Sequence, residues 1–358
     1  VAVSGEPRLS FCSNDYLGLA AHPELASAAA VAAARDGFGA SASRLVSGDL
    51  PAHRQLEAAL ARFFDRPAAL LFPTGYQTNI GVLTALAGPD DVIVSDALNH
   101  ASIIDGCRLS RARIAVYPHG DPEGAAHLLD QARTARRRLL VTESLFSMNG
   151  DAAPLARLAE AAQSHDAIFI VDEAHAIGVL GPRGRGLCAA SDVTPDVLIG
   201  TLGKALATAG GFAAGSDVLR DLLVNRARTF IFTTALPPPV AAAALAALEI
   251  VDSPEGDRRR ALLRAHADNL SPQLAALRPS GLEAPPDTVA GSPIQPFVVG
   301  SDTAALALSA ALADRQIFVP AIRPPTVPVG SARLRITLSA SHDPADLDRL
   351  VLALRSRA

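Results

Sequence analysis

Two short apolar segments, each followed by polar residues, constrain the fold of this chain more than any other feature. Residues 167–171 precede the letters DEAH at 172–175, and residues 197–200 precede TLGK at 201–204. Each apolar segment has the length of a buried strand whose C-terminal end carries the polar residues. Ligands bind at the C-terminal ends of the strands in open α/β sheets. The sequence therefore predicts an α/β fold with a functional site on these two strand ends.

Strand and helix patterns alternate along most of the chain, which favours a mostly parallel central sheet with helices on both faces. The expected strands span 68–72, 91–95, 113–117, 139–142, 167–171, 197–201 and 210–214, with helices at 100–110, 121–134, 154–164 and 216–228. From about residue 254 the pattern changes to that of a smaller C-terminal α+β domain. We expect an N-terminal arm at 1–40, a large domain at 41–252 and a small domain at 253–358.

The composition narrows the classes of function. The net charge is −4 and no apolar run reaches about 18 residues, so neither nucleic acid nor a membrane is an expected partner. Cys12, Cys107 and Cys188 are odd in number and scattered, which favours a reducing cytosol without a disulfide framework. The first residues show no signal-peptide pattern and no initial Met. We expect a cytoplasmic protein.

Lys204 is the only lysine among 32 Lys and Arg residues. Arginine serves equally well where only positive charge matters, whereas lysine alone can lose its proton near neutral pH and act as an amine nucleophile. The single lysine could be a chance result of the bias toward arginine in this chain. Its place at a strand end makes a chemical role the stronger hypothesis.

Three features together favour pyridoxal 5′-phosphate (PLP) as cofactor. Lys204 could form a Schiff base with its aldehyde, and Asp172 could pair with its cationic ring nitrogen. The segment 73–79 leads from a strand into a helix, whose first N–H groups could hold the phosphate. Taken singly, Asp172 could be a cap or part of a salt bridge, His175 a packed polar residue, and 73–79 an ordinary helix start. Their joint presence with Lys204 predicts a PLP site.

Other motifs are incomplete. The DEAH letters belong to a helicase family, but such a protein also needs GxxxxGK[ST], and Gly203-Lys204 is followed by Ala205. No GxGxxG follows a strand, so a dinucleotide fold is not supported. The nine histidines show no HxxxH spacing and no CxxC occurs, so no metal site is expected. Hydrolysis by Ser, His and Asp is not excluded by composition, although GxSxG does not occur.

The order of its motifs gives the chain a family resemblance. The motifs are SNDYLGL (13–19), SRLVSG (43–48), FPTGY (72–76), NHAS (99–102), TESLFSMNGD (142–151), VDEAH (171–175), GRG (184–186), TLGK (201–204) and RLRIT (333–337). With these segments the chain resembles the α-oxoamine synthases, a PLP-dependent family of fold type I. It departs from the family pattern at Ala176, where a Gly is usual, and in lacking a further N-terminal helical segment.

The resemblance implies roles for the residues around the cofactor ring. Lys204 would hold PLP through a Schiff base and later move the substrate Cα proton. Asp172 would pair with the pyridinium nitrogen, and His100 would stack on the ring. His175 and Ser147 would hydrogen-bond the phenolic oxygen of the ring.

The resemblance also implies how the phosphate is held. The backbone N–H groups of Gly75 and Tyr76 and the hydroxyl of Thr201 would bind it. Thr233 or Thr234 would reach the phosphate of a neighbouring subunit. A homodimer with its active site at the subunit interface is thereby implied.

On the substrate side, Arg335 would bind the amino-acid carboxylate, Asn14 and Ser43 would line the site, and Arg333 would be structural. The SRLVSG segment looks most like the member of biotin synthesis, an acyltransferase that condenses L-alanine with pimeloyl-CoA or a pimeloyl carrier protein and releases CO₂. Sister enzymes join glycine to acetyl-CoA or succinyl-CoA, or serine to a long acyl-CoA. An aminotransferase on the same fold and a non-catalytic scaffold subunit are alternatives from other classes. Such scaffold subunits typically lack the Schiff-base lysine.

Overall fold

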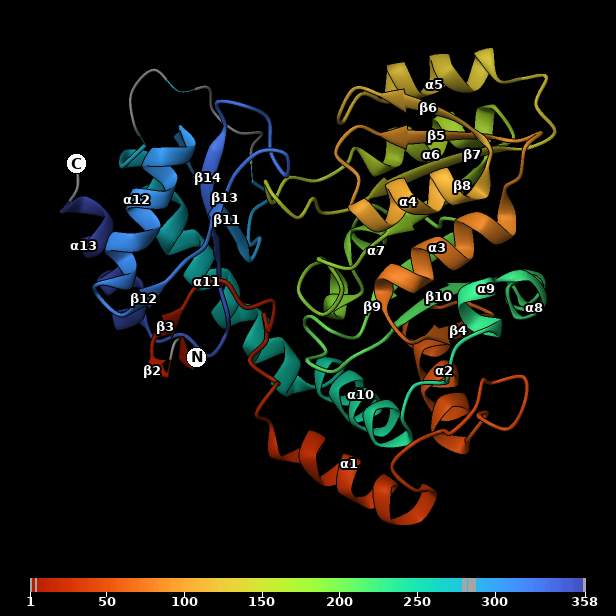
Figure 1. The fold of residues 1–358 in the computed structure, drawn as a ribbon, viewed down its shortest axis with the longest axis horizontal. Coiled ribbons are helices and arrows are strands. Elements are labelled where there is room, and N and C mark those ends of the chain that lie inside the picture. The colour runs from red at the N-terminus through yellow and green to blue at the C-terminus, as the bar shows by residue number, and fades with distance from the viewer. Residues whose placement is uncertain (1, 4, 279–281, 283–287, 357–358) are drawn as a thin grey trace. The chain divides into compact units, whose positions relative to one another are not determined.

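The computed structural model describes residues 2–3, 5–278, 282 and 288–356, which form two compact units. The larger unit holds Leu19–Phe146 and Ala152–Asp257. The smaller unit holds Val1–Gly18, Ser147–Asp151 and Arg258–Ala358. Figure 1 labels their helices and strands along the chain. Within the described part of the chain, no helix combines the length and the apolarity that crossing a membrane requires.

The larger unit is built on one seven-stranded sheet, in the order β4-β10-β9-β8-β7-β5-β6. The strands are β4 (Ala68–Phe72), β5 (Val92–Asp96), β6 (Arg113–Tyr117), β7 (Arg138–Glu143), β8 (Ile168–Asp172), β9 (Val197–Thr201) and β10 (Gly211–Gly215). Only β10 runs against its neighbours; the pairs from β9 to β6 are all parallel. The predicted mostly parallel sheet is confirmed.

Helices bury both faces of this sheet (Figure 1). Ile93, Val141 and Ile170 lie in a core with α3 (Gly75–Leu86), α4 (Ala101–Ser110), α8 (Asp217–Arg226) and α9 (Arg228–Ile231). Val94 and Val171 point to the other face, against α5 (Pro122–Gln131), α6 (Leu155–Ser164) and α7 (Leu187–Ala190). Successive side chains of a strand face opposite sides, so burial of both faces explains why the strands are continuously apolar.

The boundaries between the two units differ from the expected domain limits, which were 1–40, 41–252 and 253–358. Helix α1 (Pro23–Asp36) packs on α10 (Pro238–Val251), as does α2 (Pro51–Phe63), so residues 19–40 belong to the larger unit. Strand β3 (Leu9–Ser10) pairs with β12 (Ile317–Phe318), which ties the first 18 residues to the smaller unit. The expected arm is therefore shared between the two units.

The smaller unit is α+β, as expected. Its three-stranded antiparallel sheet has the order β11-β14-β13, and its other short strands form two pairs, β1-β2 and β12-β3. The remaining elements are β1 (Ala2–Val3), β2 (Glu6–Pro7), β11 (Ile294–Gly300), α12 (Asp302–Ala313), β13 (Ala321–Ile322), β14 (Ala332–Thr337) and α13 (Pro344–Arg355). Helix α11 (Pro254–Ala276) begins in the larger unit and continues from Arg258 in the smaller one.

One expected helix is wrong: residues 216–228 form two helices instead of one. Ala227 adopts an extended conformation (φ −70°, ψ 103°) between α8 and α9. The turn that follows places the hydroxyl of Thr229 where it donates to the carbonyl of Gln77 in α3, at 2.7 Å. This tertiary hydrogen bond favours the break over a continuous helix.

Gly211 allows β10 to lie close to the first turn of α3. A Cβ at this position would lie 2.7 Å from the N and Cα of Gly75 and 2.5 Å from Oγ1 of Thr78. Because two of these atoms are backbone, no side-chain rotation could relieve the overlap. The start of α3 is therefore positioned by the absence of a side chain on β10.

We predict that Gly211→Ala lowers the free energy of unfolding by about 1–3 kcal/mol, the usual cost of overpacking. Urea denaturation would measure it. Gly39→Ala is the matched control, because a Cβ there would meet no atom within 4 Å. Equal stability of the two variants would show that α3 is not held by this approach.

Candidate active site

The C-terminal ends of three neighbouring strands bring the site residues together. Glu143, Asp172 and Thr201 are the last residues of β7, β8 and β9. Glu143 pairs in register with Asp172. By strand alternation these side chains face the layer of α3 and α4. This is the edge at which the sequence predicted a site.

The carboxylate of Asp172 is buried, with 6% of the residue exposed. Its Oδ2 accepts a hydrogen bond from Nδ2 of Asn79 at 2.7 Å, and its Oδ1 accepts from the N–H of Ala174 at 2.9 Å. No salt bridge to it occurs within the described ranges. A buried carboxylate is costly without a cationic partner. Asp172 is therefore suited to receive a protonated ring nitrogen.

A chain of hydrogen bonds joins Asp172 to His100. Asn79 also donates to Oγ of Ser102 at 2.9 Å, and Ser102 Oγ lies 2.7 Å from Nδ1 of His100. The N–H of Ser102 donates to the same Nδ1 at 3.2 Å, which makes His100 the N-cap of α4. Burial lowers the pKa of His100, opposed by the charge of Asp172 and assisted by that of Lys204. The ring is thus neutral near pH 7 and carries its hydrogen on Nε2.

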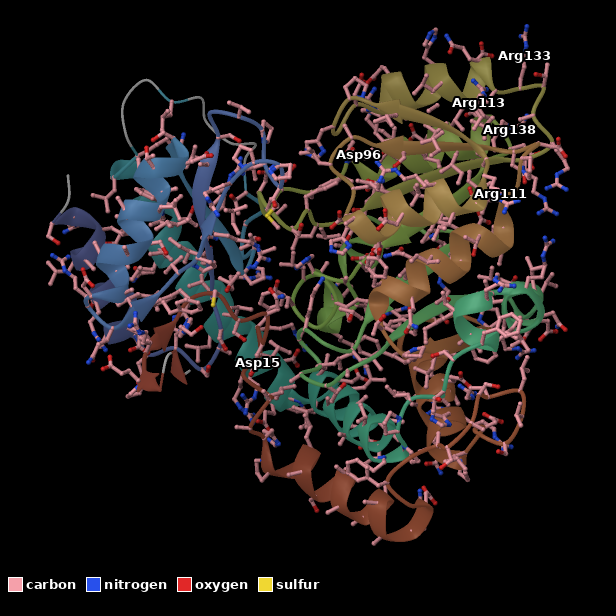
Figure 2. The ribbon with its side chains drawn as sticks, viewed as in Figure 1. Asp15, Asp96, Arg111, Arg113, Arg133 and Arg138 are labelled. Carbon is pink, nitrogen blue, oxygen red and sulfur yellow. The ribbon has the colours of Figure 1, made fainter. Side chains whose placement is uncertain are left out.

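Lys204 lies beside the histidine of the DEAH segment. Its Nζ is 2.9 Å from Nε2 of His175, a buried residue that follows β8. Several arginines, by contrast, lie at the protein surface, where charge alone suffices; Arg111, Arg113 and Arg133 are exposed examples (Figure 2). The only lysine of the chain is thus half-buried among the polar residues at the strand ends.

The first turn of α3 can hold an anion beside Thr201, whose hydroxyl donates to the carbonyl of Gly210 at 3.1 Å. Thr74 caps the helix by accepting the N–H of Gln77 at 3.0 Å, and the N–H groups of Gly75 and Tyr76 lie at the helix start, where no intrahelical acceptor exists. A Cβ on residue 75 would lie 3.3 Å from Cβ and Oγ1 of Thr201. Glycine thus leaves space between these amides and the threonine hydroxyl.

These features of the larger unit fit PLP. Asp172 lacks a cationic partner among the described residues, Gly75 leaves a space that a Cβ would fill, and Lys204 is placed to carry an aldehyde. Asp172 would hold the ring nitrogen, and the start of α3 with Thr201 would hold the phosphate.

Two further expected residues lie on loops of the larger unit. The carbonyl of Ser43 accepts the N–H groups of Val46 and Gly48, which fixes a tight turn. Thr234 is exposed, whereas the hydroxyl of the half-buried Thr233 turns back to the carbonyl of Thr234 at 3.4 Å. Of these two threonines, Thr234 is the one open to a partner.

The smaller unit holds a separate cluster around Arg335. Its Nε donates to the carbonyl of Ser147 at 2.5 Å, and its two terminal nitrogens lie 3.3 and 3.4 Å from Oδ1 of Asn14. The hydroxyl of Tyr16 donates to the same Oδ1 at 3.0 Å. Arg335 is 9% exposed, and no acidic side chain of the described residues forms an ion pair with it. A buried guanidinium without a carboxylate is suited to bind one.

The same unit contains Ser147 and Arg333. Ser147 belongs to the segment that carries the Arg335 contact, and the expected bond from its hydroxyl to the phenolic oxygen of the cofactor stays a prediction. Arg333 donates to Oδ1 of Asn149 and to the carbonyl of Ser331. These contacts tie loops together and agree with the expectation that Arg333 is structural, which stays a prediction.

Asn79, Ser102 and Glu143 also belong to the cluster around Asp172, although the sequence patterns assign them no role. Asn79 and Ser102 link Asp172 to His100, and Glu143 is a buried carboxyl beside Asp172. Signals existed: Asn79 is a polar residue in an apolar helix, and Glu143 ends a strand as Asp172 does. Neither signal specifies which neighbour the side chain meets.

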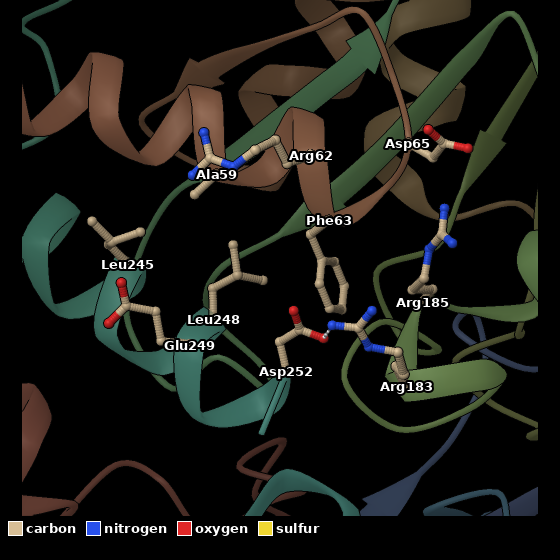
Figure 3. A pocket seen from close by; sticks show the side chains of 10 residues that line it. All are labelled: Ala59, Arg62, Phe63, Asp65, Arg183, Arg185, Leu245, Leu248, Glu249 and Asp252. Carbon is tan, nitrogen blue, oxygen red and sulfur yellow. Dashed lines mark ion pairs between the residues drawn. The ribbon is translucent and has the colours of Figure 1, made fainter. Parts of the chain in front are cut away.

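A cavity of about 370 Å³ lies apart from these residues, between α2, α10 and the turn at Pro182–Gly184 (Figure 3). Phe63, Leu245 and Leu248 form its apolar part, and Arg183 pairs with Asp252 at its edge. None of the expected site residues lines this cavity, so the cavity does not coincide with the expected site. No group of His, Cys, Asp or Glu among the described residues could hold a metal ion.

Comparisons with known proteins give a consistent result. A family model described as aminotransferase class I and II matches residues 6–354. A protein of Marinobacter nauticus and one of Anaeromyxobacter sp. (strain K), both named 8-amino-7-oxononanoate synthase, are 51% and 54% identical over 99% of this chain, and 88% and 87% of their own lengths are covered.

Solved structures agree. The serine palmitoyltransferase of S. paucimobilis, with a bound PLP–myriocin aldimine, superposes with a TM-score of 0.93 at 30% identity, covering 99% of this chain and 88% of that one. An 8-amino-7-oxononanoate synthase from Francisella tularensis gives a TM-score of 0.83 at 27% identity, covering 98% and 97% of the two chains.

We predict that Asn79→Leu weakens PLP binding by about 10- to 100-fold, because it removes a hydrogen bond to the buried Asp172 carboxylate. Titration of the apoprotein with PLP, followed by absorbance, would measure the dissociation constant. Asn225→Leu, which removes an exposed amide of α8, is the control. Unchanged affinity in Asn79→Leu would mean that Asp172 does not depend on Asn79.

Proposed function

We propose a reaction for this chain, which belongs to the class I and II aminotransferase family: the decarboxylative condensation of L-alanine with pimeloyl-CoA or a pimeloyl carrier protein. The products are 8-amino-7-oxononanoate, CO₂ and the free thiol, in biotin biosynthesis. The observation that carries this proposal is about 50% identity over 99% of the chain to relatives named for that product. We also place the enzyme in the cytoplasm, supported by its three free and scattered cysteines.

When bound, PLP supplies an electron sink for a carbanion at the Cα of the amino acid. The protein must hold that sink in its protonated form and move one proton. Asp172 is the carboxylate that would keep the ring nitrogen protonated. Its own position is set by Asn79 and by the N–H of Ala174.

Lys204 would hold the cofactor, and its amine would then act as the general base for the Cα proton. The imidazole of His175, 2.9 Å from Nζ, orients the amine and hydrogen-bonds the phenolic oxygen. The neutral ring of His100, whose Nδ1 is engaged by Ser102, would stack on the cofactor. The N–H groups of Gly75 and Tyr76, with the Thr201 hydroxyl, hold the phosphate.

Arg335 binds the carboxylate of the amino acid, a task for which the guanidinium has suitable geometry. Two observations support this role. Arg335 is buried, and its hydrogen bonds to other described residues do not include one to a carboxylate. Asn14, which contacts Arg335, and Ser43 line the substrate side. Ser147 adds a hydrogen bond to the phenolic oxygen.

The enzyme acts as a homodimer whose active site lies at the subunit interface. Large apolar side chains next to the site residues are exposed: Val46 by 80%, Phe232 by 70% and Leu98 by 42%. Val46 follows Ser43 in the same turn, Phe232 precedes Thr234, and Leu98 precedes His100. Their exposure beside three expected site residues supports a contact with another protein at this place. A second copy would cover these side chains and bring its Thr234 to the phosphate.

We predict that L-alanine with pimeloyl-CoA gives the highest kcat/KM in a panel of amino acids and acyl-CoAs scored by thiol release. The other members are glycine and serine, with acetyl-, succinyl- and palmitoyl-CoA. The expected margin is about tenfold or more, the discrimination that one or two methylene groups supply. A higher value for glycine or serine would replace the proposed reaction by that of a sister enzyme.

Three variants and a control complete this experiment. Lys204→Ala should lose about 10³-fold in kcat, because proton transfer is lost. Asp172→Asn should slow the exchange of the alanine Cα proton, measured by NMR. Arg335→Leu should raise the KM of the amino acid but not that of the thioester.

Conversion of the cofactor to its pyridoxamine form by L-alanine alone would indicate an aminotransferase instead.

We predict that inactive Lys204→Ala and impaired Thr234→Val subunits complement each other. In a mixed dimer, one site combines the intact Lys204 of one subunit with the intact Thr234 of the other. Random mixing should give about a quarter of the wild-type activity, since half the dimers are mixed and each has one complete site. Activity no higher than that of the separate variants would show that Thr234 serves its own subunit.

A further inference from the structure

Glu143 is a buried carboxyl group that none of the roles above uses. It is 3% exposed and ends β7, in register with Asp172 at the end of β8. In parallel strands, paired residues project from the same face of the sheet. Two carboxyl groups therefore lie side by side at the edge where the cofactor would bind.

The hydrogen bonds of Glu143 hold the segment that carries His100. Its backbone N–H donates to Oδ1 of Asn99 at 3.1 Å, and its carboxyl group accepts the backbone N–H of His100. Asn99 is fixed in turn by its Nδ2, which donates to Oγ of Ser95 and to the carbonyl of Val141. Glu143 thus ties the residues between β5 and α4 to the end of β7.

One oxygen of this carboxyl group is left over. Oε1 of Glu143 is buried and has no hydrogen-bond partner among the described residues. An ionised carboxylate with a bare, buried oxygen would be strongly unfavourable. Protonation removes the charge from that oxygen, while the other oxygen still accepts from His100.

Burial and the two neighbouring carboxylates also favour the protonated form of Glu143. Burial raises the pKa of Glu143 to about 8, and the negative charges of Asp172 and, less strongly, Asp96 add to this effect, whereas Lys204 and the His100 backbone oppose it. Asp96 ends β5 and is paired with His119. The group therefore keeps its proton below about pH 8 and loses it above.

We propose that Glu143 is a positioning residue of the active site: in its neutral form it holds the backbone of His100 and leaves Asp172 as the carboxylate that faces the cofactor. This inference rests on the proposed function, since it gives His100 and Asp172 their roles there. Loss of its proton puts a second negative charge beside Asp172. The reaction therefore slows as the pH rises through the titration of Glu143.

Two substitutions separate shape from charge. Glu143→Gln keeps an acceptor for the His100 N–H and a donor at the place of Oε1, but cannot ionise. Glu143→Leu keeps the volume and removes both. We expect Glu143→Leu to lose about 10²-fold in kcat at pH 7, as a misplaced stacking ring would cause, and Glu143→Gln to recover at least about tenfold of that loss. The alkaline fall of kcat/KM near pH 8 should be absent in Glu143→Gln.

An infrared measurement on the holoenzyme without substrate tests the protonation directly. The wild-type minus Glu143→Gln spectrum should contain the C=O stretch of a carboxylic acid at pH 7 and lose it at pH 9.5. Glu160→Gln, at an exposed position of α6, should give no such band at pH 7.

The outcomes are distinguishable from a failure of the proposed function. Absence of the acid band at pH 7 would overturn the proposal even in an active enzyme, and its presence would support it whichever acyl donor is used. A Glu143→Gln variant no better than Glu143→Leu would overturn the positioning role.

Discussion

The buried carboxylate of Asp172 governs the arrangement of the strand ends around it. Two hydrogen bonds, from Asn79 and from the N–H of Ala174, stabilise its charge but provide no cation. The same Asn79 donates to Ser102, and Ser102 fixes the ring of His100. One helix residue therefore orients both Asp172 and His100, the groups proposed to face the ring nitrogen and the plane of the ring. A cofactor with a cationic ring nitrogen completes a network that is already formed.

Helix α3 carries both ends of this arrangement. Its first turn offers the N–H groups of Gly75 and Tyr76 to a phosphate, and Asn79, one turn later, holds Asp172. The distance between the two functions is thus set by rigid helical geometry, not by a loop. The place of the helix is set in turn by Gly211, where the missing side chain lets β10 approach its start.

Much of this could be predicted from residue patterns, because strand ends are visible as polar letters after apolar ones. The parallel sheet follows from the alternation of strands and helices, and the proximity of Lys204 to His175 follows from two adjacent strands that end together. The role of Asn79 could not be predicted, because its helix is recognisable only as a helix and its partner lies 93 residues away. The break between the two helices at Ala227 could not be predicted either, because it depends on a tertiary hydrogen bond from Thr229 to α3.

The charges at the strand ends explain why one lysine remains in a chain otherwise rich in arginine. Asp172 and Glu143 are adjacent, and burial keeps one of them neutral. A permanently charged guanidinium at position 204 could never release its proton. An amine beside the imidazole of His175 can be charged or neutral, as a reversible bond to an aldehyde requires. Arginine can supply the charges at the surface, but only lysine can carry out the proton exchange at this site.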